Sequence, residues 1–207
     1  MGLQQFWDER YSQPEYAYGK EPNSFFREQI DLLQPGRLLM PAEGEGRNAV
    51  YAARKGWQVD AFDISEKGRE KALRLAQEAA VYIHYQVGDL DTLHFPEANY
   101  DAIGLIFAHF PASRRSAYHR HLVRLLKPGG TIILEGFSKA HRAYQQKHPG
   151  VGGPQDEKVL FSLEEIAEDF QGLQFKRLEE CEVHLQEGLY HVGLGKVIRM
   201  VASKPLL

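Results

Sequence analysis

The chain has 207 residues, a length that suits one domain with a sizeable buried core. Hydrophobic residues make up 43% and charged residues 26%, and a net charge of −3 gives no reason to expect nucleic acid or an anionic membrane as a partner. The single cysteine, Cys181, excludes an intramolecular disulfide and a cysteine-based zinc site. The first ten residues lack the apolar core of a signal peptide and no stretch is apolar enough to span a membrane, so we expect a cytoplasmic protein.

The N-terminal segment is predicted to be mostly helical. Residues 3–12 have the spacing of a short amphipathic helix, and Phe25, Ile30 and Leu33 continue a second helix that stops at residues 35–36. The loop between these helices is rich in aromatic residues, which are costly to expose unless they pack on something. Tyr18 and Asn23 are therefore candidates for covering a cofactor or substrate. We expect residues 1–36 to form a helical lid on a core of residues 37–207, within one domain.

From Arg37 onward, short β-like runs alternate with helical runs. This alternation predicts a parallel sheet with right-handed crossovers. The predicted strands are 38–40, 57–62, 81–87, 101–107 and 131–134, and the predicted helices are 48–55, 65–79 (with Ser65 as N-cap) and 113–126.

The C-terminal region follows a different pattern. Residues 141–154 are rich in glycine and proline near their end and are predicted to be a mobile loop. Ser162 and Glu165 form a predicted capping box that opens a helix reaching about residue 170. The β-like runs 174–185 and 194–202 are joined by a link too short for a parallel crossover, so we expect an antiparallel hairpin.

A glycine-rich turn connects the first predicted strand to the first helix. Gly44, Gly46 and Ala49 fit the dinucleotide pattern G-x-G-x-x-G/A, and Asp63 follows 17 positions after Gly46. However, the turn also carries Glu43 and Glu45, whose charges would oppose a pyrophosphate at the helix N-terminus. A cofactor with an ammonium and a sulfonium, such as S-adenosylmethionine (SAM), tolerates these carboxylates better. The terminal hairpin is also unlike the second half of a dinucleotide fold.

Two aspartates follow neighbouring predicted strands. Asp63 ends the second strand and is placed to accept hydrogen bonds from both ribose hydroxyls, although it could instead help to cap the following helix. Asp89 ends the third strand and is placed to accept the adenine amino group, with an ordinary turn aspartate as the alternative.

Candidate catalytic residues follow the fourth predicted strand. His109 can act as a general base or bind an anionic substrate, and the alternative is a histidine bonded to backbone at a strand end. Arg114 lies at a helix start, where the helix dipole disfavours a cation, so it is a second candidate for contact with an anionic substrate. We expect no metal site, because His119 and His121 face different directions on a helix, and no hydrolase, because G-x-S-x-G is absent.

Together, five motifs resemble the class I SAM-dependent methyltransferases, and in particular the TehB-type tellurite-resistance branch, with thiopurine methyltransferases as more distant relatives. The motifs are residues 43–51 (EGEGRNAVY), 62–65 (FDIS), 88–90 (GDL), 109–111 (HFP) and 126–130 (LKPGG), joined by 18–23, 152–154 and 187–191. Met40 and Ala42 depart from the family pattern, which has Asp and Gly at these places.

The resemblance implies a three-layer α/β Rossmann-like fold, with a mostly parallel seven-stranded sheet and an antiparallel C-terminal hairpin. It also implies that the glycine turn holds the methionine moiety of SAM, Asp63 the ribose, and Asp89 with Leu90 the adenine. The expected cofactor-binding residues are Glu43, Gly44, Gly46, Asn48, Asp63, Ile64, Ser65, Asp89, Leu90, Phe107 and Ala108.

The function that we expect from the sequence is SAM-dependent methyl transfer to a small-molecule acceptor. A chalcogen oxyanion (tellurite or selenite) or a thiol as the acceptor follows from the resemblance alone. Two alternatives remain open at this point, an NAD(P)-dependent oxidoreductase and a non-catalytic SAM-binding module.

Overall fold

A seven-stranded sheet forms the centre of the computed structural model, which describes residues 2–206. The strand order is β3-β2-β1-β4-β5-β7-β6; β1 to β5 are parallel, and β7 is antiparallel to both β5 and β6. The strands are β1 (Arg37–Pro41), β2 (Gln58–Asp63), β3 (His84–Val87), β4 (Tyr100–Ile106), β5 (Leu126–Phe137), β6 (Gln174–Glu187) and β7 (His191–Ser203). The predicted α/β class, the seven strands and the terminal antiparallel hairpin are confirmed.

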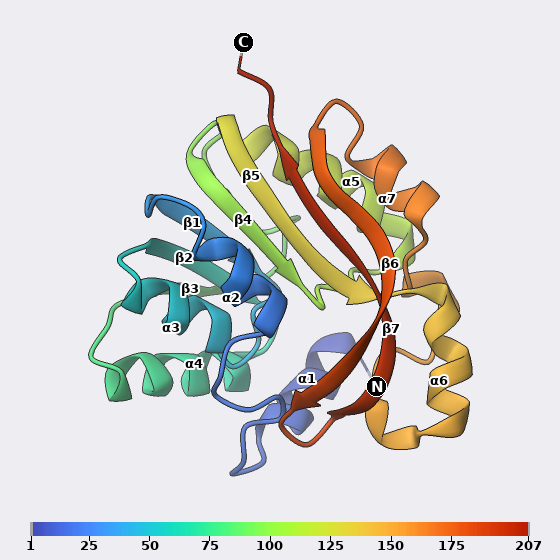
Figure 1. Cartoon of the computed structure of the whole chain (residues 1–207). Coiled ribbons are helices and arrows are strands. Elements are labelled where there is room, and N and C mark those ends of the chain that lie inside the picture. The colour runs from blue at the N-terminus through green and yellow to red at the C-terminus, as the bar shows by residue number, and fades with distance from the viewer. Residues whose placement is uncertain (1, 207) are drawn as a thin grey trace.

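Helices cover both faces of this sheet (Figure 1). The α-helices are α1 (Leu3–Tyr11), α2 (Ser24–Ile30), α3 (Arg47–Arg54), α4 (Glu66–Glu78), α5 (Ala112–Leu125), α6 (Arg142–Lys147) and α7 (Leu163–Asp169), and the short 3-10 helices are η1 (Lys139–His141), η2 (Pro149–Val151) and η3 (Glu157–Val159). The helices α2, α3 and α4 lie on one face, while α5 and α7 lie on the other.

Side-chain alternation along the strands divides the core into two layers. In β1, Leu38 and Met40 pack with α2, α3 and α4, whereas Leu39 points to the opposite layer with α5 and α7. All three side chains are fully buried. Since successive strand residues point to opposite faces, a run of consecutive apolar residues is what a strand covered on both faces requires.

Two predicted helix starts are confirmed by their caps. The Ser65 hydroxyl accepts a hydrogen bond from the Gly68 amide at the start of α4. Ser162 and Glu165 make the reciprocal bonds of a capping box at the start of α7. These bonds satisfy amides that have no partner inside the helix.

The prediction of a mobile loop at residues 141–154 is wrong. This region contains α6 and η2, and the Gln145 side chain donates hydrogen bonds to the carbonyls of Gly152, Gly153 and Pro154 at 2.8–3.1 Å. The second N-terminal helix is shorter than predicted because it ends at Ile30. Both strands of the terminal hairpin are longer than predicted, and β5 extends from Leu126 to Phe137.

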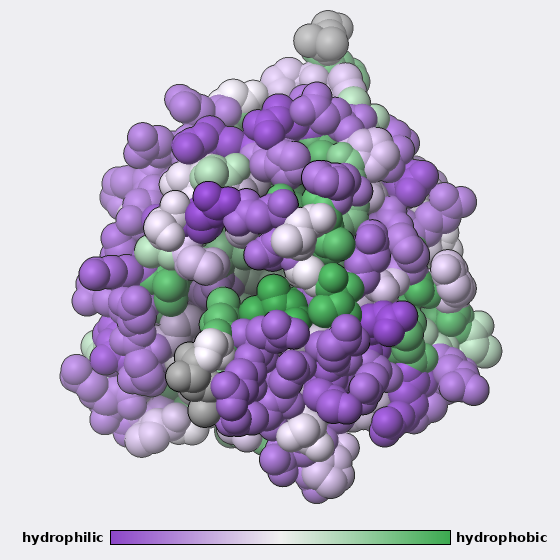
Figure 2. Space-filling view, turned by 180° about the vertical axis from the view of Figure 1, so that it is seen from behind, coloured by the Kyte–Doolittle hydropathy of each residue, from purple (hydrophilic) through white to green (hydrophobic). Residues whose placement is uncertain are grey.

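The functional edge of the sheet is set by its topology. The strand order reverses between β1 and β4, which opens a crevice at their carboxyl ends, where open α/β sheets bind ligands. Helix α1 and the β6–β7 hairpin both lie at this end of the sheet (Figure 1). The molecule seen from behind is hollowed near its centre, with apolar side chains in the hollow and polar ones around it (Figure 2). None of the described helices has the length and hydropathy of a membrane span.

Candidate functional site

The glycine turn between β1 and α3 is shaped by neighbouring protein atoms. Gly44 and Gly46 have φ values of 60° and 85°, in the region that favours glycine. A Cβ on Gly44 would lie 2.6 Å from the Tyr11 hydroxyl oxygen, and one on Gly46 would lie 2.6 Å from the Cβ of Ala72. The open sides of both glycines therefore admit α1 and α4.

Glu43 closes the N-terminus of α3. Its Oε1 accepts hydrogen bonds from the amides of Asn48 (2.9 Å) and Ala49 (2.7 Å). Burial raises the pKa of Glu43 to about 7. The Asn48 side chain in turn accepts a bond from the amide of Asn23 at 2.9 Å. The helix amides that would bind a phosphate are thus already occupied by a carboxylate of the chain itself.

The second acid of the turn, Glu45, faces the N-terminal segment. It forms a buried ion pair with Lys71 of α4 at 2.7 Å and accepts a hydrogen bond from the Ala17 amide at 2.8 Å. Glu45 therefore fastens residues around Ala17 to the glycine turn, and its charge is neutralised within the protein.

Asp63 lies at the carboxyl end of β2, beside the glycine turn. One carboxylate oxygen accepts a hydrogen bond from the Gly44 amide at 3.0 Å, and the other accepts one from the Ser65 amide at 2.9 Å. Each oxygen keeps a further lone pair for a ligand hydroxyl. Burial raises the pKa of Asp63 to about 6. Ile64, the next residue, is half-buried.

The Asp89 side chain already accepts hydrogen bonds within the turn that follows β3. Its Oδ1 accepts bonds from the Asp91 amide and from the Thr92 amide and hydroxyl, at 3.0–3.1 Å, so this oxygen stabilises the turn after β3. The side chain of Leu90 is buried in the core layer that contains Phe62. Both the turn role and a ligand role for the second oxygen of Asp89 agree with this geometry.

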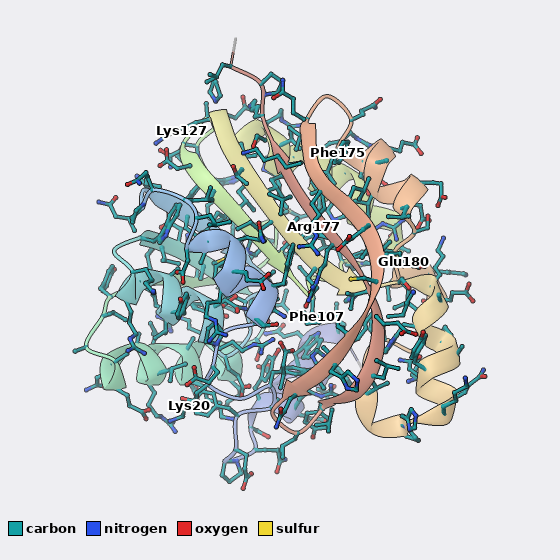
Figure 3. The ribbon with its side chains drawn as sticks, viewed as in Figure 1. Lys20, Phe107, Lys127, Phe175, Arg177 and Glu180 are labelled. Atoms are coloured by element: carbon teal, nitrogen blue, oxygen red, sulfur yellow. The ribbon has the colours of Figure 1, made fainter. Side chains whose placement is uncertain are left out.

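At the end of β4, the chain turns sharply. Phe107 has a φ of 52°, and its amide donates a hydrogen bond to the Glu135 carbonyl at 2.7 Å. Its side chain lies below the ends of β4 and β5 (Figure 3). Ala108, the next residue, is buried. A positive φ at a phenylalanine is a strained arrangement, of the kind that concentrates at functional sites.

The structure contradicts a base role for His109. Its Nδ1 bonds to the Val159 carbonyl (2.9 Å), and its Nε2 accepts a bond from the Phe137 amide (3.1 Å). The ring stacks against Phe161 with a centroid separation of 4.6 Å, and burial lowers the pKa of His109 to about 4. With both nitrogens bonded to backbone, His109 holds the segment around Val159 to the sheet.

Arg114 likewise forms a surface ion pair. Its partner is Asp91, and both side chains are exposed. The neighbouring Arg115 is the buried one: it donates to the Leu160 carbonyl at 3.2 Å and pairs with Glu165 at 3.1 Å. Both arginines are thus engaged within the protein, which argues against the predicted contact between Arg114 and an anionic substrate.

The two candidates in the N-terminal segment reach the edge of the sheet. The Tyr18 ring lies 4.4 Å from the His191 ring, and its hydroxyl accepts a bond from Arg10 at 2.9 Å. Asn23 is buried, and its Nδ2 donates to Glu135 (2.7 Å) and Glu187 (2.9 Å). Asn23 thus ties this segment to β5 and to the hairpin.

Sequence reasoning gave no role to two residues of the hairpin, Glu187 and His191. Glu187 ends β6, His191 begins β7, and the two are paired across the turn. Oε2 of Glu187 bonds to Nδ1 of His191 (3.1 Å) and forms an ion pair with Arg47 (3.0 Å). The only signal in the sequence was the 187–191 stretch within the family resemblance.

The donor set at this edge fits a cationic adenosyl cofactor better than a dinucleotide. Asp63 offers free carboxylate lone pairs, while the amides at the start of α3 are bonded to Glu43 and the nearby cations Arg47 and Lys71 are paired with carboxylates. Residues 2–206 also contain no group of three or more His, Cys, Asp or Glu placed to hold a metal ion.

Comparisons with known proteins agree with this chemistry. Residues 39–130 match the model of the methyltransferase domain family. Thiopurine S-methyltransferase from Legionella pneumophila (strain Paris) is 25% identical over 219 residues, covering 94% of each chain.

Two solved structures share the fold. TehB from Haemophilus influenzae is 17% identical with a TM-score of 0.69, over 97% of this chain and 66% of that chain. Magnesium protoporphyrin IX methyltransferase from Synechocystis PCC 6803, solved with bound S-adenosylhomocysteine (SAH), is 19% identical with a TM-score of 0.70, over 98% of each chain.

Proposed function

We propose that this chain is a class I SAM-dependent methyltransferase that transfers a methyl group to a small-molecule acceptor at the carboxyl ends of β1 and β4. SAM is the cofactor and supplies a methyl group on an electrophilic sulfonium. The observation that carries the choice of site is the pair of contacts at the glycine turn. Asp63 presents carboxylate lone pairs there, while Glu43 occupies the amides of α3 that a phosphate would need.

In this proposal Asp63, with Ile64 and Ser65, holds the ribose, and Asp89 with Leu90 borders the adenine. The glycine turn from Glu43 to Asn48 and the turn at Phe107 and Ala108 border the methionine part. Within the expected lid of residues 1–36, residues 12–23 are the part proposed to cover the site. The Ala17 amide donates a hydrogen bond to Glu45 of the glycine turn, and Asn23 donates one to Glu187 of the hairpin. Holding two reactants in line can account for about 7–11 kcal/mol of a barrier.

The acceptor is proposed to be a chalcogen compound, either a thiol or an oxyanion such as tellurite or selenite. The names of the similar thiopurine S-methyltransferase and of TehB support this class. The TehB-type branch remains a proposal on the same grounds.

The experiment that tests the proposed function is a turnover assay with SAH release as the readout. The full chain is incubated with SAM and a panel of thiols, thiopurines and chalcogen oxyanions. We expect SAH release that depends on both protein and acceptor. Tight SAM binding without SAH release on the whole panel would instead indicate a non-catalytic SAM-binding module.

A further inference from the structure

Three histidines lie close together at the carboxyl edge of β5, and two of them have no free nitrogen. His109 is bonded to the Val159 carbonyl and the Phe137 amide. His141 accepts a bond from the Lys196 amide at 3.1 Å and bonds to the Gly152 carbonyl at 3.1 Å. Neither ring can take a proton without losing a backbone hydrogen bond.

His191 differs from both. Its Nδ1 bonds to Glu187, and Nε2 has no hydrogen-bond partner within residues 2–206. Nε2 of His191 is not fully enclosed by protein atoms, whereas Nε2 of His119 is fully buried without a hydrogen-bond partner. The ring packs against Phe107 (4.6 Å), Phe137 (5.1 Å) and Tyr18 (4.4 Å), measured between ring centroids. His191 therefore lies where the ends of β4 and β5 meet the proposed lid.

Glu187 fixes the tautomer of this histidine. Burial alone would raise the pKa of Glu187, but its bonds to His191 and Arg47 lower it to about 2, so the carboxylate is ionised. An ionised carboxylate accepts hydrogen bonds only, so Nδ1 carries the proton and Nε2 keeps its lone pair. Asn23 and Arg47 hold the carboxylate in place.

Burial is the main reason why the His191 ring is neutral at neutral pH. It lowers the pKa of His191; Glu187 opposes this shift, while Arg47 and Arg10 add to it. The other titratable groups that face the ring are Tyr18 from the lid, and His109 and His141 from the ends of β4 and β5. A neutral histidine with a free, oriented nitrogen has the properties of a general base.

We propose that His191, positioned by Glu187, is the base that removes the proton from a thiol or selenol acceptor during methyl transfer. This inference rests on the proposed function. The acceptor chalcogen forms a bond to the methyl carbon while the bond between that carbon and the sulfonium breaks. The electron pair of the broken bond stays on the sulfur, so that the leaving group is SAH. The acceptor proton moves to Nε2 and then to water.

The test compares two acceptors with wild-type protein and the full-length His191→Asn variant. One acceptor is an alkanethiol, which is mostly protonated at pH 7, and the other is an electron-poor aryl thiol, which is already ionised. We expect the variant to lose about 10²–10⁴-fold in kcat with the alkanethiol at pH 7 and to change less than about threefold with the aryl thiol. Its SAM affinity should equal that of the wild type.

The pH profile gives a readout that a merely structural role would not change. With the alkanethiol, wild-type kcat should level off above pH 7, whereas that of His191→Asn should rise about tenfold per pH unit up to the pKa of the thiol, because only thiolate then reacts. Glu187→Gln should lose less kcat with the alkanethiol than His191→Asn does. It replaces His191→Asn in the test if that variant does not fold. The matched control is His184→Asn, an exposed histidine on the neighbouring strand β6, for which we expect unchanged rates.

Equal losses with both thiols, or no loss with the alkanethiol, would overturn the assignment of His191. Wild-type protein that binds SAM but methylates only oxyanions would overturn the acceptor class and leave the proposed function intact. Wild-type protein that does not bind SAM would instead overturn the proposed function itself.

Discussion

Glu43 and Asp63 illustrate how two neighbouring acids, one in the glycine turn and one at the end of β2, acquire different tasks. Glu43 faces inward and bonds the first amides of α3, while Asp63 bridges the glycine turn and the start of α4 with lone pairs to spare. The sequence showed that the turn is acidic and unsuited to phosphate. It did not show which acid faces the helix, because that depends on the φ values adopted by Ala42 and Gly44.

The affinity for SAM should increase with pH. Burial raises the pKa values of Asp63 to about 6 and of Glu43 to about 7, so both carboxyls take up protons as the pH falls below neutrality. A bound cation favours the carboxylate forms, so binding releases protons and strengthens as the pH rises through this window. We expect about a tenfold higher affinity at pH 7.5 than at pH 5.5 by calorimetry.

The control ligand for this measurement is SAH, which lacks the sulfonium charge. Its affinity should vary less over the same pH range. Affinity for SAM that is constant, or that falls with rising pH, would show that these two carboxyls do not sense the cofactor charge.

Replacing His109 by alanine should reduce stability more than turnover. The substitution leaves the Val159 carbonyl and the Phe137 amide without their partner, and each unsatisfied buried group costs about 1–3 kcal/mol. The measurement is the free energy of unfolding in urea, combined with kcat per folded molecule. A variant with unchanged stability and lost turnover would restore His109 as the catalytic base.

At the scale of elements, most helices and strands were predictable from hydrophobic periodicity and caps. The predicted hairpin, the cap at Ser65 and the capping box at Ser162 rest on local chemistry and are confirmed. Helix α6 was missed because it depends on side-chain contacts with the segments on either side of it, which hydrophobic periodicity does not reveal. Gln145 is held by the carbonyls of residues 152–154, and His141 stacks on Phe137 with a centroid separation of 4.1 Å.

The same limit applies to the pair formed by Glu187 and His191. The two residues are four apart in sequence, and this spacing does not predict a contact in a hairpin. The orientation of the Glu187 carboxylate also depends on hydrogen bonds from Asn23 and Arg47, which belong to other elements. The sequence alone therefore predicts a base at a strand end, which is the position of His109, and not in the hairpin.

Replacing Gly188 by alanine should loosen the proposed lid. Gly188 has a φ of 59°, and a Cβ there would lie 2.5 Å from the Ala17 carbonyl oxygen and 2.5 Å from the Gly19 amide nitrogen. Because these are backbone atoms, the hairpin and the lid must move apart. We expect faster amide hydrogen exchange in residues 12–23.

The matched control is Gly172→Ala. Gly172 has a φ of 89°, but nothing lies within 4 Å of a Cβ at this position. It therefore reproduces the backbone strain without the collision. Equal exchange in residues 12–23 for the two variants would mean that contact with the hairpin does not hold the lid.

At the scale of the whole molecule, the proposed ligand edge is assembled from six parts of the chain: α1 with the proposed lid, the glycine turn, the ends of β2 and β3, the turn after β4 and the terminal hairpin. Each of them contains or adjoins a motif of the family resemblance. The hairpin closes the proposed site because β6 and β7 extend beyond the end of β5, whose last paired residue, Phe137, lies opposite Val197. The predicted hairpin was too short to reveal this.

The most direct measurement of the central claim is a calorimetric titration of the purified chain with SAM and, separately, with NADPH. We expect SAM to bind at one site per chain and NADPH not to bind. We also expect Asp63→Asn to weaken SAM binding by about 10–100-fold, because it removes a charge-assisted acceptor of the ribose hydroxyls. NADPH binding in place of SAM, or SAM affinity unchanged in Asp63→Asn, would contradict the account.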